Sequence, residues 1–139
     1  MVNRDYFKEA ITWNGDAGYP PAFEKMPQLA GFEAAPGVVL RPFWGERLMA
    51  SYVTFAAHAE APLHQHDQEQ LSFVISGTLT FTVGHESREM GAGDIVSVPP
   101  GVPHAAKAGP SGAVAIDMFS PPREGFRELM AASQGVSPS

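Results

Sequence analysis

Two histidines one residue apart stand in the segment PLHQHDQEQL, residues 62–71, and this spacing could bind a metal ion. In an extended chain, residues i and i+2 point to the same face, so His64 and His66 could reach one cation together. Gln70 follows His66 at an even offset and should share that face, whereas Glu69 should face the opposite way. A carboxylate is ordinarily the stronger ligand, and a β-bulge would reverse the parity, so both residues remain candidates for a further ligand.

A second segment, GDIVSVPPGVPH at residues 93–104, places another histidine after a proline-rich turn. Its pattern predicts a short strand that ends in Pro-Pro-Gly, and the prolines hold the following turn stiffly. His104 would therefore be presented in a fixed position, which suits a metal ligand. Since the chain contains no cysteine, nitrogen and oxygen atoms must supply all the ligands of any metal.

A third segment, AVAIDMF at residues 113–119, carries one acidic residue inside an apolar run. A buried carboxylate is unfavourable unless it is paired, and burial raises its pKa towards the range in which it can exchange protons. By parity, Asp117 shares a face with Phe119, and Arg123 follows after two prolines. Two interpretations stay open: an Asp117–Arg123 pair that fixes the closing segment, or an acid–base group in an active site.

The elements that position these residues are predicted to be short strands in an all-β fold. The 14 glycines and 13 prolines are dispersed along 139 residues, which is typical of frequent turns and argues against a helical bundle. One closing helix is expected at residues 123–133, where Phe126, Leu129 and Met130 have helical spacing. Strands are expected at residues 38–44, 47–57, 70–76, 78–84, 94–99 and 113–119. Together they predict a β-sandwich or barrel.

The chain divides into three parts within one expected domain. Residues 1–37 have no clear periodicity and contain four prolines, so we expect an irregular N-terminal arm that packs on the domain or on a partner subunit. Residues 38–122 are expected to form the barrel, and residues 123–139 the closing helix and a tail.

Charge and hydropathy argue against several classes of partner. A net charge of −6 with no basic cluster argues against nucleic acid and against anionic membranes. The first 16 residues contain no apolar core of a secretory signal. No apolar run approaches the roughly 18–20 residues that span a bilayer. We therefore expect a cytoplasmic protein that acts on a small molecule.

The spacing of these residues resembles that of the cupin family over residues 38–122. The first cupin motif is glycine, five residues, His-x-His, three or four residues, glutamate, six residues and glycine. The second is glycine, five residues, Pro-x-Gly, two residues, histidine, three residues and asparagine. The residues that fit are His64, His66, Gly77, Gly93, Pro99, Gly101 and His104. Three positions depart from the pattern: His58 replaces the first glycine, Gln70 the glutamate and Ala108 the asparagine.

This resemblance implies a double-stranded β-helix, or jelly-roll, barrel that holds one divalent metal ion. The implied ligands are His64, His66, Gln70 and His104, and the ion could be Zn, Ni, Mn, Fe or Co. Three neutral imidazoles and a neutral amide leave the charge of the ion uncompensated. Such an ion suits a Lewis acid for an anionic or enolic oxygen better than an O₂-activating iron site, which typically includes a carboxylate. Cupins of this size commonly pair, so a homodimer is expected.

The segment DMFSPPRE, residues 117–124, resembles a narrower group. It is similar to the small cupins of pectin and alginate catabolism that convert 4,5-unsaturated monouronates into linear ketonised sugars. That resemblance implies catalytic roles for Asp117, Phe119 and Arg123.

Three alternatives stay open. A cyclase or isomerase acting on a polyketide or another enolisable metabolite would use the same Lewis acid, and a wide, apolar pocket would favour it. An Fe(II) dioxygenase would consume O₂, and a ligand-binding cupin would bind without turnover.

Overall fold

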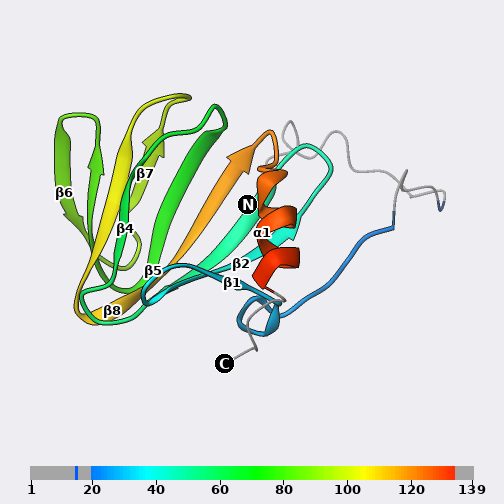
Figure 1. Cartoon of the computed structure of the whole chain (residues 1–139), viewed down its shortest axis with the longest axis horizontal. Helices are drawn as coiled ribbons and strands as arrows, with labels where there is room; N and C mark the ends of the chain where they lie inside the picture. Colours follow the sequence, from blue (N-terminus) through cyan, green and yellow to red (C-terminus); the bar gives the residue numbers. More distant parts are fainter. Residues whose placement is uncertain (1–14, 16–19, 134–139) are drawn as a thin grey trace, which may run out of the picture.

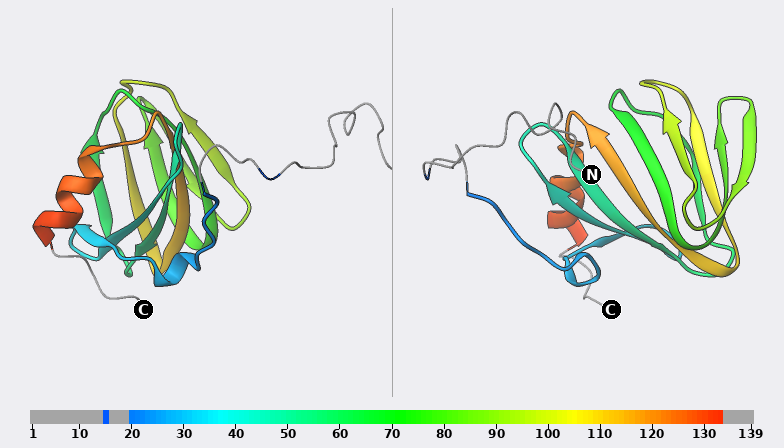
Figure 2. Two further views of the ribbon diagram at one scale, coloured as in Figure 1. Left: turned by 90° about the vertical axis from the view of Figure 1, so that its right-hand side faces the viewer. Right: turned by 180° about the vertical axis from the view of Figure 1, so that it is seen from behind.

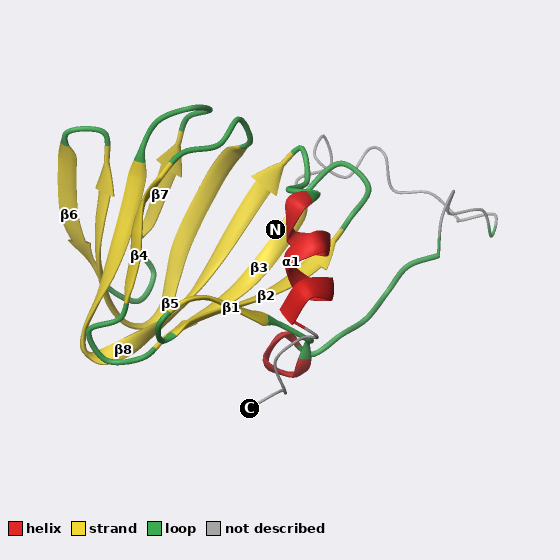
Figure 3. Cartoon of the chain, viewed as in Figure 1, coloured by secondary structure: helices red, strands yellow, loops and turns green. Residues whose placement is uncertain are grey.

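Eight antiparallel strands make up most of the regular structure in the computed structural model, which describes residue 15 and residues 20–133 (Figure 3). The rest of the expected N-terminal arm and the tail after residue 133 lie outside the described residues. The elements are η1 (Met26–Gln28), β1 (Phe32–Ala35), β2 (Val38–Trp44), β3 (Met49–Phe55), β4 (Glu60–His64), β5 (Glu69–Val83), β6 (Glu86–Met90), β7 (Ile95–Val98), β8 (His104–Ser120) and α1 (Gly125–Ser133).

Two long strands, β5 and β8, pair with each other along their length and connect two halves of the sheet. In one half, the end of β5 and the start of β8 are flanked by β6 and β4. In the other half, the start of β5 and the end of β8 are flanked by β7 and β3. The strands predicted separately at 70–76 and 78–84 are therefore one bent strand, because the chain continues through Gly77 without a loop.

The bend between the two halves depends on two glycines. Gly77 and Gly112 adopt φ angles of 73° and 71°, in the left-handed region that favours glycine. A Cβ atom on Gly77 would collide with the carbonyl oxygen of Gly112, and one on Gly112 would collide with the carbonyl oxygen of Phe55. The sheet consequently folds on itself, as the side views show (Figure 2), and the expected jelly-roll barrel is confirmed.

The sheet begins earlier than expected, since β1 lies inside the segment predicted as an irregular arm. A turn at Gly37, with φ of 77°, brings Phe32 opposite Leu40 of β2. The sequence Phe-Glu-Ala-Ala contains a single strongly β-favouring residue, so its pattern is too weak to indicate a strand. Pairing with β2 and burial of the Phe32 side chain stabilise it instead.

The predicted closing helix is confirmed as α1, which lies beside one end of the folded sheet (Figure 1). Phe126 is its buried residue, and the ring stacks edge-on against Phe32 and Phe119, with centroids 5.4 and 5.7 Å away. This aromatic cluster ties β1, β8 and α1 together at the end of the barrel where the expected site residues lie. In the described part of the chain, no helix has the length and apolar character needed to cross a bilayer.

Candidate active site

Three histidines that are far apart along the chain meet at one end of the barrel. His64 ends β4, His104 begins β8, and the two are directly paired in register. His66 lies in the loop before β5, two residues beyond the end of β4 at His64. One ring nitrogen from each of the three histidines lies within 4.8 Å of the others. This separation is compatible with a single cation.

Backbone carbonyls determine which ring nitrogens face that point. The Nδ1 atoms of His64, His66 and His104 lie 2.8, 3.0 and 2.8 Å from carbonyl oxygens of residues 62, 68 and 102. A carbonyl oxygen only accepts a hydrogen bond, so each Nδ1 carries the proton and each Nε2 keeps its lone pair. The Nε2 atom of His104 is buried and has no hydrogen-bond partner among the described residues. A cation at this point would satisfy it.

For two of the imidazoles, those of His66 and His104, the surroundings also favour the uncharged form, which is the form that binds a metal. Burial lowers the pKa of His104 to about 4, and the nearby rings of His64 and His66 contribute to this shift. Burial likewise lowers the pKa of His66, with a further contribution from the positive charge of Arg123.

Gln70 is the residue of β5 that faces the histidines. Its side chain is 4% exposed, and Oε1 lies 2.9 Å from Nε2 of His66. Since Nδ1 of His66 donates to a carbonyl, both atoms of this close pair present lone pairs, an arrangement that a cation would stabilise. Glu69 is exposed on the opposite face. The donor set of three imidazoles and one amide oxygen therefore fits a divalent cation.

Asp117 lies on the same inner face of the sheet, between two serines. It is in register with Ser51 on β3 and with Ser72 on β5. Ser72 Oγ donates a hydrogen bond of 2.6 Å to Oδ1 of Asp117. Burial raises the pKa of Asp117 to about 6, although the hydrogen bond from Ser72 and the charge of Arg123 oppose the shift. A carboxyl group with this pKa can both accept and return a proton near neutral pH.

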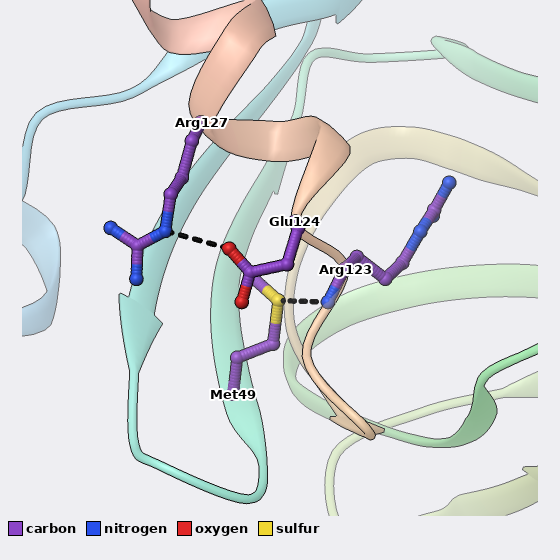
Figure 4. A network of polar contacts seen from close by, with 4 residues as sticks. All are labelled: Met49, Arg123, Glu124 and Arg127. Atoms are coloured by element: carbon purple, nitrogen blue, oxygen red, sulfur yellow. Dashed lines mark hydrogen bonds and ion pairs between the residues drawn. The ribbon is translucent and has the colours of Figure 1, made fainter.

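Arg123 extends over the aromatic cluster from the turn after β8. Its guanidinium carbon lies 5.4 Å from the ring centroid of Phe119 and 4.7 Å from that of Phe126. Its backbone N–H contacts Met49 Sδ at 3.0 Å, and the side chain points away from the Glu124–Arg127 ion pair (Figure 4). Among the described residues no salt bridge joins Arg123 to Asp117. The guanidinium is consequently available to an anionic ligand.

A cavity of about 270 Å³ brings these groups together. Its polar lining residues are His64, Gln70, His104, Asp117 and Arg123. Away from these groups the walls are apolar, and they include Val53, Phe55, Leu79, Phe81, Ala106 and Ala115. The predicted site residue Phe119 also lines the cavity, and Phe126 and Leu129 of α1 border it.

Sequence reasoning did not identify Ser72, Phe32 or Phe126 as part of this site. Ser72 has a signal that could have found it, because it stands two residues after Gln70 and must share its face. Phe32 and Phe126 have no local signal, since they reach the cavity only through the packing of β1 and α1 on the barrel end.

Comparisons with known proteins agree with this geometry. The family model described as a cupin domain matches residues 51–119. An RmlC-like cupin from Shewanella frigidimarina is 32% identical, with 77% of this chain and 96% of that chain covered and a TM-score of 0.70. KdgF from a Halomonas species is 27% identical, with 76% of this chain and 98% of that chain covered and a TM-score of 0.71.

Two curated relatives match shorter stretches. The dimethylsulfoniopropionate lyase DddQ of Ruegeria pomeroyi is 39% identical over 67 residues, which are 48% of this chain. The H2HPP isomerase of Bacillus subtilis is 39% identical over 61 residues, which are 43% of this chain. The chain spans only 33% and 25% of the length of these two proteins.

One departure from the cupin pattern, His58 in place of glycine, keeps the backbone conformation that is typical of glycine. His58 stands where the first motif has glycine, and it adopts a φ of 62°. This left-handed conformation is the one for which glycine is ordinarily preferred, so the backbone keeps its turn although the residue type differs.

Proposed function

Because this chain belongs to the cupin family, we propose that it is a metal-dependent isomerase that ketonises a small unsaturated acid, most specifically a 4,5-unsaturated monouronate. The observation that carries the proposal is the shared cavity, which Asp117 and Arg123 line together with His64, His104 and Gln70. The likeness to KdgF, a uronate-ketonising cupin, supports the same substrate class.

The metal-binding part of the site comprises four residues. His64, His66 and His104 would hold one divalent ion through their Nε2 atoms, and Gln70 through Oε1. When bound, the ion supplies Lewis acidity that polarises an enolic or hydroxyl oxygen. The ligand set contains no carboxylate, so an anionic oxygen is the natural further ligand.

Arg123 would bind the carboxylate of the substrate. A guanidinium matches a carboxylate with two parallel hydrogen bonds, and the aromatic rings of Phe119 and Phe126 exclude water from its sides. Phe119 also forms part of the wall against which a ring would lie. The substrate would thus be oriented with its acid group towards the C-terminal turn.

Asp117 would transfer the proton. For the cyclic uronate, its carboxylate would accept the hydrogen of the ring hemiacetal hydroxyl, so that a C=O bond forms there while the bond from that carbon to the ring oxygen breaks and leaves an enolate. The protonated Asp117 would then deliver the hydrogen to the far carbon of the enolate C=C bond, which gives a second C=O bond and a C–H bond. No electrons leave the substrate, and no co-reactant is needed. Ser72 holds Oδ1 of Asp117, which orients the carboxylate for this exchange.

Replacing Arg123 by lysine tests the carboxylate-binding role. Lysine keeps the charge but loses the planar fork, so KM for an acidic substrate should rise about tenfold or more, since a hydrogen bond to a charged group contributes about 1.5–3 kcal/mol. The value of kcat should fall less than KM rises. Arg127→Lys is the matched control, because Arg127 lies on α1 and pairs with Glu124 outside the cavity. Equal kinetic effects of the two substitutions would contradict the assignment.

The apolar walls favour one second candidate, an isomerase of a less polar enolisable acid. A sugar ring exposes hydroxyl groups that need hydrogen-bond partners, and the cavity walls beyond the polar end offer few. The partial match to the H2HPP isomerase supports an isomerase as the reaction class. The small volume of about 270 Å³, however, suits a single-ring ligand and not the wide pocket expected for a polyketide.

Turnover of two substrate classes distinguishes these candidates. Metal-replete protein would be given a 4,5-unsaturated monouronate, and the decay of its ultraviolet absorbance would be compared with a control without enzyme, because these rings open spontaneously. We expect clear acceleration. No acceleration, together with turnover of a less polar enolisable acid, would favour the second candidate. O₂ consumption would indicate a dioxygenase, and binding without turnover a ligand-binding cupin.

We also propose that the protein is a homodimer that pairs through the outer face of the sheet. Ile95 of β7 lies opposite Phe73 of β5, and Leu71 follows on the same face. Ile95 and Leu71 are 62% and 42% exposed, and identical apolar patches can bury each other about a two-fold axis. Light scattering at micromolar concentration should give twice the chain mass, and Ile95→Asp should lower it. A monomer mass for the unaltered protein would refute this.

A further inference from the structure

We propose that Ser72 is a positioning residue that determines which atom of the Gln70 amide faces the metal site. In doing so, it connects the carboxylate of Asp117 to the metal ligand Gln70. This inference rests on the metal-binding part of the proposed function, and it assigns to Ser72 a role that is independent of which substrate the cavity accepts.

A chain of three short contacts crosses the floor of the site. Oε1 of Gln70 lies 2.9 Å from Nε2 of His66, and Nε2 of Gln70 donates to Oγ of Ser72 at 2.8 Å. Oγ of Ser72 donates in turn to Oδ1 of Asp117 at 2.6 Å. Gln70 and Ser72 are 4% and 1% exposed, so water does not compete for these hydrogen bonds.

The donor and acceptor roles along this series of hydrogen bonds follow from the single hydrogen of the serine hydroxyl. A carboxylate only accepts hydrogen bonds, and 2.6 Å is in the range of a charge-assisted O–H···O⁻ bond, so the hydrogen of Ser72 goes to Asp117. The oxygen of Ser72 can then only accept from Gln70. The group of Gln70 that faces Ser72 must therefore be the NH₂ group, and the carbonyl oxygen faces the histidines.

The opposite orientation of the amide would remove the metal ligand. With Gln70 rotated by half a turn, its NH₂ group would face Nε2 of His66, and an amide nitrogen has no lone pair to offer a cation. Its oxygen would also need the hydrogen of Ser72, which would leave Oδ1 of Asp117 without its donor. Losing a charge-assisted bond in an enclosed site is unfavourable, so Ser72 excludes the rotated state.

Ser51 provides a matched control for Ser72. It is also a buried serine in register with Asp117, but it approaches from β3 and not from β5. Its Oγ atom has no hydrogen-bond partner among the described residues, so it takes no part in orienting Gln70. Replacing either serine by alanine removes the same atom from the same layer of the barrel.

The test measures metal affinity. Apoprotein would be titrated with Co²⁺ by calorimetry, and the visible absorbance of the bound ion would report its ligand set. We expect Ser72→Ala to weaken Co²⁺ binding by about 10–100-fold, as removal of a partner that orients a ligand does. The cobalt spectrum should change, because the amide oxygen is no longer held towards the ion. Ser51→Ala should leave both the affinity and the spectrum unchanged.

A double-mutant cycle separates positioning from a general loss of structure. In a Gln70→Ala background the ligand is absent, so adding Ser72→Ala should cause no further loss of affinity. An equal loss in both backgrounds would overturn the proposal, and so would an affinity of Ser72→Ala equal to that of the unaltered protein. Failure of the unaltered protein to bind Co²⁺ would instead reject the metal site itself, and the proposed function with it.

Discussion

Asp117→Asn is expected to lower kcat for the unsaturated acid by about 10²–10⁴-fold, the usual contribution of a positioned acid–base group, with little change in KM. Asparagine keeps the shape of aspartate but cannot exchange the proton. Its Oδ1 atom can still accept the hydrogen bond from Ser72, so the orientation of Gln70 and the metal content should remain near those of the unaltered protein. Ultraviolet assays, by stopped flow or at steady state, measure kcat and KM, and metal analysis of the same sample measures the metal content.

A purely structural Asp117 would give a different pattern. If Asp117 and Arg123 only fixed the closing segment, Asp117→Asn and Arg123→Lys would lower the unfolding temperature together and share any loss of activity. The lack of a salt bridge between them among the described residues already argues against such a pair. A parallel loss of thermal stability in the two variants, with kcat and KM changing in the same way, would remove the catalytic assignment.

The double substitution His64→Ala/His104→Ala is expected to abolish metal binding and activity. Removing one partner that merely orients a ligand costs about 10–100-fold in affinity, so loss of two direct ligands should cost more than that. Elemental analysis of the purified protein by mass spectrometry measures the bound metal per chain.

The control for this substitution is His85→Ala. His85 lies in the exposed turn between β5 and β6, outside the cavity lining, and its replacement should leave the metal content unchanged. Full metal occupancy in the His64→Ala/His104→Ala protein would show that the ion, if any, is held elsewhere.

The inward orientation of Gln70 could be predicted because alternation within a strand depends only on the backbone. The same parity indicated that Glu69 would face outwards, as it does. The path between His64 and Gln70 could not be predicted in this way, since residues 65–68 form a loop whose shape depends on contacts with the rest of the barrel. One such contact is the hydrogen bond from the backbone N–H of Gly101 to the carbonyl oxygen of His66.

The special position of Asp117 could also be predicted from the sequence, because a single carboxylate within an apolar run is unusual. Alternation after Gln70 also places Ser72 on the inner face, but its proposed role arises only from its register with Asp117 across two strands, which no local pattern contains. The start of the sheet at β1 and the aromatic closure by Phe32 and Phe126 depend on packing between segments distant in the chain. Local patterns contain no information on such contacts.

The proposed chemistry depends above all on one divalent ion held by His64, His66, His104 and Gln70, and anomalous diffraction from crystals of the metal-loaded protein tests this directly. We expect a single anomalous peak at the polar end of the cavity, with the three Nε2 atoms at about 2.0–2.1 Å and Oε1 of Gln70 at about 2.0–2.2 Å. A peak outside this cavity, or one at which Glu69 replaces Gln70 as the oxygen ligand, would contradict the account.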